Sequence, residues 1–203
     1  MKKLYPILIL SLLFLLIGCS KESVEFSKLQ DRGGLYYKVN SEEPYSGTSF
    51  ELYKNGQKES EGTYKDGKLD GLQTDWYENG LKQKEGTYKD EKIDGLRTEW
   101  YENGQKKYEK TYKDGKQVWK WTKWYENGQK SSEGTYKDDK LEGLEIYWFE
   151  NGQKGGELNI NEKGDGIVIE WYENGQKFIE RTFKDGKPNK LIGEWNEDGS
   201  VKE

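Results

Sequence analysis

The chain has 203 residues, of which 35% are charged and only 32% hydrophobic, and its formal net charge is -5. An acidic chain is poorly suited to binding nucleic acid or anionic lipid headgroups. Its single cysteine excludes an intramolecular disulfide. The aromatic fraction of 14% argues against a disordered chain, because disordered segments are poor in aromatic residues. We therefore expect a folded, polar protein without a nucleic-acid partner.

The N-terminus has the features of an export signal. A basic start precedes an apolar run over residues 7–17, which is shorter than the roughly 20 residues that a membrane-spanning helix needs. The run ends in Leu16-Ile17-Gly18-Cys19, which resembles the lipobox of bacterial lipoproteins. That resemblance implies that residues 1–18 are a signal peptide and that Cys19 carries the lipid. The alternative is an ordinary signal peptide followed by an unrelated cysteine.

Lipid on Cys19 would give the protein a membrane anchor. Two or three acyl chains hold a protein stably at a bilayer, where one chain does not. We therefore expect an exported protein at the cell membrane or the outer membrane. Residues 19–31 are polar, and we interpret them as a tether between the lipid and the folded part.

Residues 32–203 are dominated by a repeat of about 24 residues. The words Trp-Tyr-Glu-Asn-Gly and Glu-Gly-Thr-Tyr-Lys-Asp recur along this part of the chain. One series of Asn-Gly or Asp-Gly pairs recurs at steps of 23 or 24 residues and ends at Gly56, Gly80, Gly104, Gly128, Gly152, Gly175 and Gly199. We therefore expect an array of about seven units that share one design.

Each unit is expected to form a β-hairpin. Asn-Gly favours a two-residue type I′ turn, and the Lys-Asp-Gly-Lys segment supplies the return turn. In that register Tyr77 lies opposite Lys82 and Asp75 lies opposite Lys84. The pattern predicts an all-β fold, an elongated single-layer antiparallel meander of tandem hairpins roughly 60 Å long. Stacking between neighbouring units replaces a thick core.

The recurring words resemble the MORN repeat variants of the YwqK-like antitoxin family. The words that carry the resemblance are Tyr-Glu-Asn-Gly-Gln-Lys and Gly-Thr-Tyr-Lys-Asp-Gly-Lys-Leu-Asp-Gly, and it extends from about Arg32 to Gly199. The motif is specific to a type of repeat and not to one function. The family label implies an antitoxin or immunity role, which in an exported lipoprotein is restricted to a toxin of the envelope.

Catalytic chemistry has little support in the sequence. The chain has no histidine, so it lacks an imidazole general base, a triad histidine and an imidazole metal ligand. The carboxylates recur at fixed positions, as turn residues do, and those of the return turns lack the graded acidic spacing of a calcium loop. We therefore expect no enzyme activity, no catalytic residue, no metal site and no cofactor.

The clearest departure from the repeat is Val118-Trp119-Lys120-Trp121, which replaces the Asp-Gly-Leu-Gln of residues 70–73. By strand alternation, four side chains share one face here, and Tyr108 of the preceding strand reaches the same region. The four are Trp119, Trp121, Lys123 and Tyr125. Two interpretations stay open: the tryptophans pack on neighbouring strands, or they form an exposed patch, since Trp and Tyr are frequent at binding hot spots.

These features predict a membrane-anchored envelope lipoprotein whose repeats act as a protein-binding or scaffold module. The identity of the protein partner is open. One alternative is an immunity protein that neutralises an envelope-located toxin. The other is a module that binds a cell-wall glycan.

Replacing Cys19 with alanine should release the protein into the soluble fraction or leave it unprocessed, because the thioether cannot form. Cell fractionation and mass spectrometry of the mature N-terminus measure this. Ser20→Ala is the control and should stay in the membrane fraction. Normal processing and membrane retention of Cys19→Ala would contradict lipidation.

Overall fold

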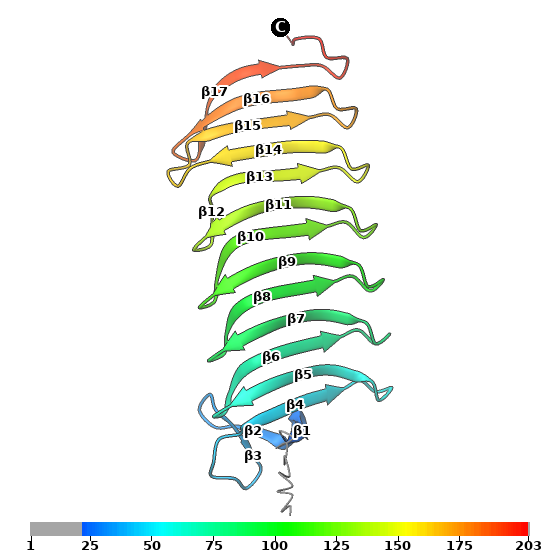
Figure 1. Cartoon of the computed structure of the whole chain (residues 1–203), viewed down its shortest axis with the longest axis vertical. Helices are drawn as coiled ribbons and strands as arrows, with labels where there is room; N and C mark the ends of the chain where they lie inside the picture. The colour runs from blue at the N-terminus through cyan, green and yellow to red at the C-terminus, as the bar shows by residue number, and fades with distance from the viewer. Residues whose placement is uncertain (1–21, 203) are drawn as a thin grey trace, which may run out of the picture.

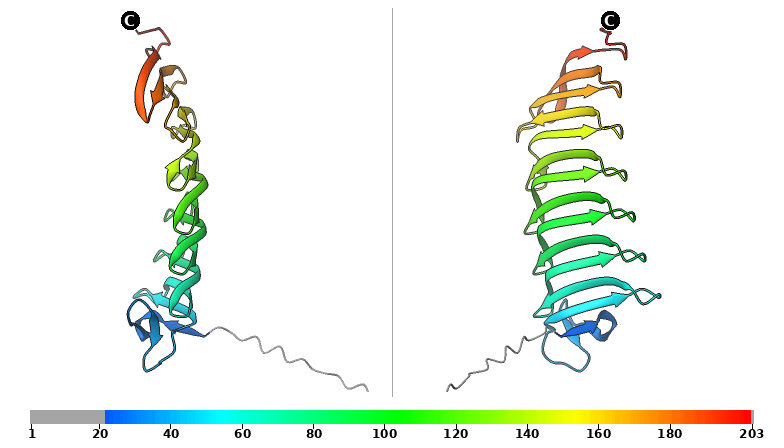
Figure 2. Two further views of the ribbon diagram at one scale, coloured as in Figure 1. Left: turned by 90° about the vertical axis from the view of Figure 1, so that its left-hand side faces the viewer. Right: turned by 45° about the vertical axis from the view of Figure 1, so that its right-hand side comes forward.

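The structure is a computed structural model and describes residues 22–202. Its strands follow one another in chain order and form a sheet that is much longer than it is wide (Figure 1). Seen edge-on, the sheet is one layer thick (Figure 2). The predicted all-β, single-layer meander of hairpins is therefore confirmed. The predicted signal peptide and Cys19 lie outside the described residues.

The long sheet contains 15 strands. In spatial order they are β1 (Ser23–Glu25), β4 (Gly47–Leu52), β5 (Lys58–Lys65), β6 (Lys68–Trp76), β7 (Lys82–Lys89), β8 (Lys92–Trp100), β9 (Lys106–Lys113), β10 (Lys116–Trp124), β11 (Lys130–Lys137), β13 (Gly143–Trp148), β14 (Lys154–Ile160), β15 (Gly166–Trp171), β16 (Lys177–Lys184) and β17 (Lys187–Glu194), with β12 (Lys140–Leu141) paired to β11. A short 3-10 helix, η1 (Phe26–Lys28), leads into a separate two-stranded sheet of β2 (Leu29–Asp31) and β3 (Tyr36–Lys38). Among residues 22–202, no helix is both long enough and apolar enough to cross a membrane.

The N-terminal end of the array differs from the prediction. The sequence predicts a tether over residues 19–31, but this is wrong from Ser23 onwards, where the chain is part of the fold. Strand β1 pairs with β4 in parallel and covers the backbone groups at that edge of the sheet. Tyr45 is only 3% exposed. Its hydroxyl lies 3.0 Å from the Glu22 carbonyl oxygen and 2.7 Å from the Thr48 carbonyl oxygen. The contacts of residues 22–25 with Tyr45 and β4 join parts of the chain that are far apart in sequence, so the polar composition of the segment does not reveal them.

The Asn-Gly loops are one residue longer than predicted. In the loop after β6, the Tyr77 amide donates to the Leu81 carbonyl and the Gly80 amide donates to the Tyr77 carbonyl, at 2.8 and 2.9 Å. Gly80 has φ +82°, as in a type I turn followed by one left-handed residue. The Asn79 side-chain oxygen accepts the Leu81 amide at 2.9 Å and fixes this geometry. The two-residue type I′ turn predicted at Asn-Gly is therefore wrong.

The longer loop shifts the register of each hairpin next to it. Lys82 lies opposite Trp76, and not opposite Tyr77 as predicted. A bulge follows, after which Asp75 lies opposite Lys84 as predicted. The residue across the hairpin from the first lysine after each loop is thus a tryptophan in most units, and Leu52 in the first.

Type I′ geometry occurs in the return turns instead. Asp66 and Gly67 have φ +49° and +82°, and the residues on either side of them pair across the hairpin. Both turn positions need a left-handed backbone, which is why Asp-Gly recurs there. Glu91 and Asp139 take the glycine position with φ +65° and +64°, at a cost of roughly 1–2 kcal/mol each relative to glycine.

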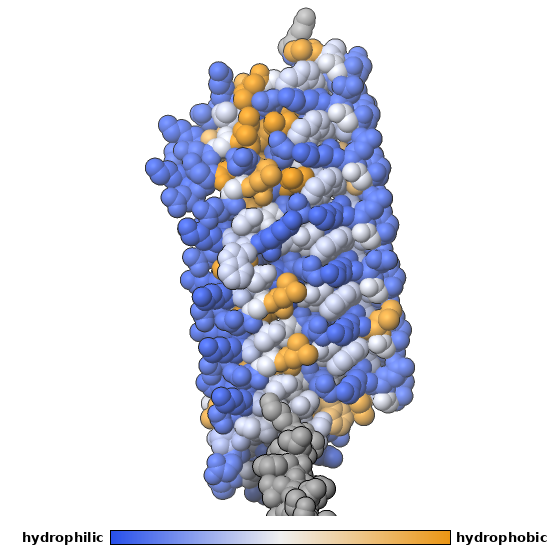
Figure 3. All heavy atoms as spheres, viewed as in Figure 1, coloured by the Kyte–Doolittle hydropathy of each residue, from blue (hydrophilic) through white to orange (hydrophobic). Residues whose placement is uncertain are grey.

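A column of alternating tryptophan and lysine runs along one side of the sheet, which we call the ladder face. The Lys82 ammonium, which extends from the strand opposite Trp76, lies 5.7 Å from the centre of the Trp100 ring in the next unit. The same contact recurs in Lys58–Trp76, Lys106–Trp124, Lys130–Trp148, Lys154–Trp171 and Lys177–Trp195. Alternating pale and blue side chains follow the length of the sheet in Figure 3. Each exposed contact of this kind stabilises by about 0.5–1 kcal/mol.

Hydrogen bonds tie each loop to the next. The tyrosine hydroxyl of one loop donates to the tryptophan carbonyl one unit further on. The pairs are Tyr53–Trp76, Tyr77–Trp100, Tyr101–Trp124, Tyr125–Trp148 and Tyr172–Trp195, at 2.6 to 3.0 Å. At the other edge, the Asp70 carboxylate accepts the amide of Asp90 in the next return turn, at 3.3 Å. A hairpin that carries both bonds is therefore held at both ends by its neighbours.

The C-terminal units are more apolar on the ladder face than the others. Thr74 and its equivalents Thr98 and Thr122 are buried there, whereas isoleucines occupy this position at Ile146 and Ile169. Figure 3 shows apolar side chains gathered over this end of the sheet. Aliphatic contacts therefore replace the threonine column towards β17.

One bond of the tyrosine series is missing, because Phe149 occupies the tyrosine position and has no hydroxyl. Phe149→Tyr should stabilise the protein by about 1 kcal/mol, since the new hydroxyl can reach the Trp171 carbonyl. Urea unfolding measures the change in free energy. Tyr101→Phe is the matched control, because it removes the 2.9 Å bond to Trp124 and should destabilise by a similar amount. If both variants unfold like the parent protein, the tyrosine bonds contribute nothing.

Candidate functional site

Trp119 stands out from the repeat in both backbone and exposure. Its φ is +60°, in the left-handed region that a bulky residue rarely adopts. Gly71, Gly95 and Gly143 hold the equivalent position in other units, also with positive φ. The Trp119 side chain is 66% exposed. It is therefore an exposed tryptophan where the array otherwise uses glycine.

The left-handed backbone takes Trp119 out of the strand alternation. The pairing of β10 with β9 is irregular between Val118 and Trp121. At the equivalent glycines, an added Cβ would point at Thr63 or Thr87 of the preceding strand, on the ladder face. Trp119 is thus directed to the ladder face, and the prediction that it shares a face with Trp121 and Lys123 is wrong.

Trp121 packs on its neighbours. Its ring meets that of Tyr136 edge-on at 6.1 Å and covers Gly134, where an added Cβ would lie 2.8 Å from the indole nitrogen. That nitrogen is buried and has no hydrogen-bond partner among residues 22–202. Of the two interpretations left open by the sequence, packing therefore describes Trp121 and exposure describes Trp119.

Tyr108 and Lys123 lie where the sequence places them, directly across from one another on β9 and β10. Lys123 is exposed and Tyr108 is half-buried. Burial raises the pKa of Tyr108, and a hydrogen bond with Glu99 raises it further. The hydroxyl therefore stays protonated at neutral pH and can act as a donor.

Tyr125 has a structural role instead. It lies in the loop after β10, and its hydroxyl donates to the Trp148 carbonyl at 2.7 Å. It therefore belongs to the tyrosine series and is not part of a surface formed with Trp121 and Lys123.

Two cationic residues beside Trp121 were not predicted from the sequence. Arg97, Lys110 and Trp121 are consecutive partners across β8, β9 and β10. The Lys110 ammonium lies 4.8 Å from the centre of the Tyr108 ring. The signal was present, since Glu-Lys-Thr-Tyr at residues 109–112 departs from the usual Glu-Gly-Thr-Tyr. The face opposite the ladder thus carries a cationic, aromatic cluster at β8–β10.

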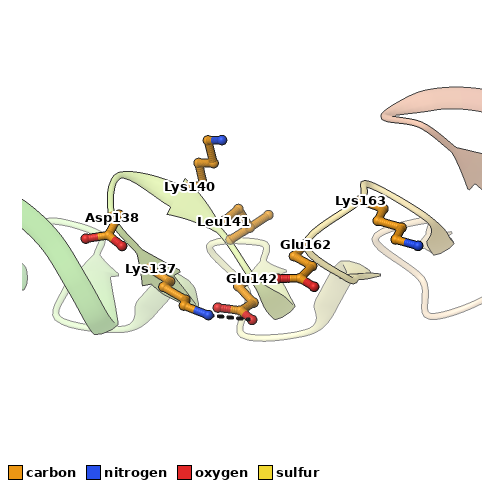
Figure 4. A pocket seen from close by; sticks show the side chains of 7 residues that line it. All are labelled: Lys137, Asp138, Lys140, Leu141, Glu142, Glu162 and Lys163. Carbon is orange, nitrogen blue, oxygen red and sulfur yellow. Dashed lines mark ion pairs between the residues drawn. The ribbon is translucent and has the colours of Figure 1, made fainter.

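A hollow of about 370 Å³ lies at the turns around residues 137–142 and 162–163, on the C-terminal side of β10 (Figure 4). Its lining residues are Lys137, Asp138, Lys140, Leu141, Glu142, Glu162 and Lys163. The Lys137 ammonium lies 3.9 Å from the Glu142 carboxylate, and the side chains of Asp138, Lys140 and Lys163 lie away from this pair (Figure 4). Within the described part of the chain, no group of three or more His, Cys, Asp or Glu residues is arranged to hold a metal ion.

Comparison with known proteins identifies the repeat. The chain matches the MORN repeat variant over residues 45–66, 69–90, 93–114, 120–138 and 164–185. It is also similar to a crystal structure of accessory secretory protein 1, 2 and 3 in Streptococcus pneumoniae, with 16% sequence identity and a TM-score of 0.21. That similarity covers 59% of this chain and 21% of the other. No curated protein matches the chain.

The five matched segments together cover just over half of the chain and follow the hairpins from Tyr45 onwards. Trp119 falls in a gap between two of them. Repeats of this kind suggest a repeat-based protein-binding module. The chain belongs to the MORN repeat variant family.

Proposed function

We propose that the protein is a lipid-anchored module of the cell envelope that binds a protein partner through the ladder face at Trp119. The observation that carries this proposal is the exposed, left-handed Trp119. Exposed tryptophans are enriched among the residues that dominate protein interfaces.

Folding alone gives no reason for tryptophan at this position. A left-handed conformation costs an ordinary residue roughly 1–2 kcal/mol, and glycine avoids that cost. The side chain is two-thirds exposed and so recovers little of this by burial. Backbone strain of this kind tends to occur at functional sites. A binding role accounts for the tryptophan.

The proposed anchor is close to the fold. Residues 20–22 are the only ones between Cys19 and β1. Along the sheet, β10 is seven strands from β1, or roughly 34 Å at the usual strand spacing. This separation would allow a partner at Trp119 to bind without contacting the lipid headgroups.

The proposed function can be stated more narrowly once the partner is known. A toxin that acts in the envelope would make this protein its immunity protein. A structural envelope protein would make it a scaffold. A cell-wall glycan as the ligand would replace the protein-binding proposal.

The strain at Trp119 is tested by comparing glycine with alanine at this position. Trp119→Gly should be more stable than Trp119→Ala by about 1 kcal/mol, because both lose the ring but only glycine relieves the left-handed backbone. Thermal and urea unfolding measure the difference. Glu91→Gly against Glu91→Ala is the control pair at a return turn and should show the same order. If the alanine variant at residue 119 is the more stable one, the strain argument fails.

Binding is tested by cross-linking in cells that express the full chain. Trp119→Gly should reduce the yield of cross-linked partner at least tenfold, the usual effect of removing a hot-spot side chain. Leu96→Ala is the matched control, because Leu96 is also apolar and 53% exposed on the same face, and it should leave the yield unchanged. A yield that is the same in both variants would rule out Trp119 as the contact.

A further inference from the structure

The face opposite the ladder carries acidic side chains that differ in how they are paired. In the second unit, the Asp75 carboxylate lies 2.6 Å from the Lys84 ammonium across the hairpin. In the third unit, Glu99 pairs with Arg97 on its own strand. The acids of these two units therefore receive a cation from the array itself.

Glu145 and Glu170 have no such partner, since neither takes part in any ion pair among residues 22–202. Glu170 holds the position of Asp75, but the residue across from it, where Lys84 would be, is the buried Ile179. Glu145 lies opposite Leu158. Both carboxylates are only partly exposed, and burial raises the pKa of Glu145.

A hollow of about 220 Å³ lies between these two acids. Its lining is Glu145, Tyr147, Glu157, Leu158, Val168 and Glu170. The Glu157 carboxylate is already paired with Lys154 at 2.9 Å, so two of the three acids lack a cation. Arg181 extends from the strand beside Val168 and forms no ion pair with either acid.

Two consecutive glycines shape the wall of the hollow. The Tyr147 ring lies across Gly155 and Gly156, where an added Cβ would come within 2.3 and 2.2 Å of ring atoms. Other units have larger residues here, such as Gln83 and Lys84. The two glycines thus supply no cationic side chain and let the Tyr147 ring lie flat beside the acids.

We propose that this hollow binds a lysine or arginine side chain of a protein partner. The cationic head would lie between the Glu145 and Glu170 carboxylates, where charge-assisted hydrogen bonds form. Its methylene stem would pack on Leu158 and Val168, with the Tyr147 ring at the side. The proposal rests on the proposed protein-binding function and adds a second contact of defined chemistry.

Binding of a fluorescein-labelled hexalysine peptide to the full chain in detergent tests this proposal. The double variant Glu145→Gln, Glu170→Gln should weaken hexalysine binding about tenfold or more, as removal of a charge partner does. The double variant Glu150→Gln, Glu173→Gln is the matched control, because it removes the same charge from exposed loop residues of the same two units. It should change the affinity by less than about twofold, as a rim charge does.

A positive charge added inside the hollow gives a second test of the same site. Leu158→Lys supplies a cation from the array, as Lys110 and Arg181 do at the equivalent position of other units. It should fill the hollow and weaken hexalysine binding as strongly as the double glutamine variant. Thermal unfolding checks that each variant is folded.

Three outcomes would overturn the proposal: no hexalysine binding, equal losses in the two glutamine pairs, or unchanged binding by a folded Leu158→Lys variant. Trp119→Gly should leave hexalysine affinity unchanged, because Trp119 is directed to the other face. A failure at this hollow is therefore distinguishable from a failure of the proposed function at Trp119.

Discussion

The stacking of lysine on tryptophan between neighbouring hairpins is the interaction on which the rest of the structure depends. A sheet one layer thick has no interior, and among its described hydrophobic residues only Tyr45 and Ile179 are buried. Lys82, between Trp76 and Trp100, covers apolar ring area with its stem while its charge stays in water. Because every hairpin repeats this contact, a very polar chain can remain folded, and each unit depends on the next.

That dependence divides the residues of the array into two groups. Residues that recur in each unit, such as the loop tyrosine and the return-turn aspartate, hold one hairpin to another. Residues that occur only once in the array are not needed to hold one hairpin to another. Trp119 and Glu145 are of the second kind, and each is less favourable for folding than its counterparts, through strain in one case and an unpaired, partly buried charge in the other. The proposed binding role would account for such residues in an otherwise regular array.

The period and the turn glycines were sufficient to predict the all-β meander, because they are local signals. What the sequence left open was decided by backbone geometry that neither the period nor the residue types specify. Asn-Gly is compatible with two hairpin loops, and the choice made at Asn79 depends on its side-chain bond to the Leu81 amide. The face of Trp119 was predicted wrongly because strand alternation assumes a regular backbone, which the left-handed residue breaks. The region of the candidate site was therefore predictable from broken periodicity, whereas its geometry was not.

A single-layer sheet also constrains how a partner can bind. Trp119 is directed to the ladder face, whereas Glu145 and Tyr147 lie on the opposite face, a few strands further along. One rigid globular partner cannot cover both contacts without passing round the edge of the sheet. An extended segment that wraps this edge could reach both, as could two partners held on the two faces. Each arrangement uses a property of a single-layer sheet, namely that side chains on both of its faces reach the surface, as Trp119 and Tyr147 do.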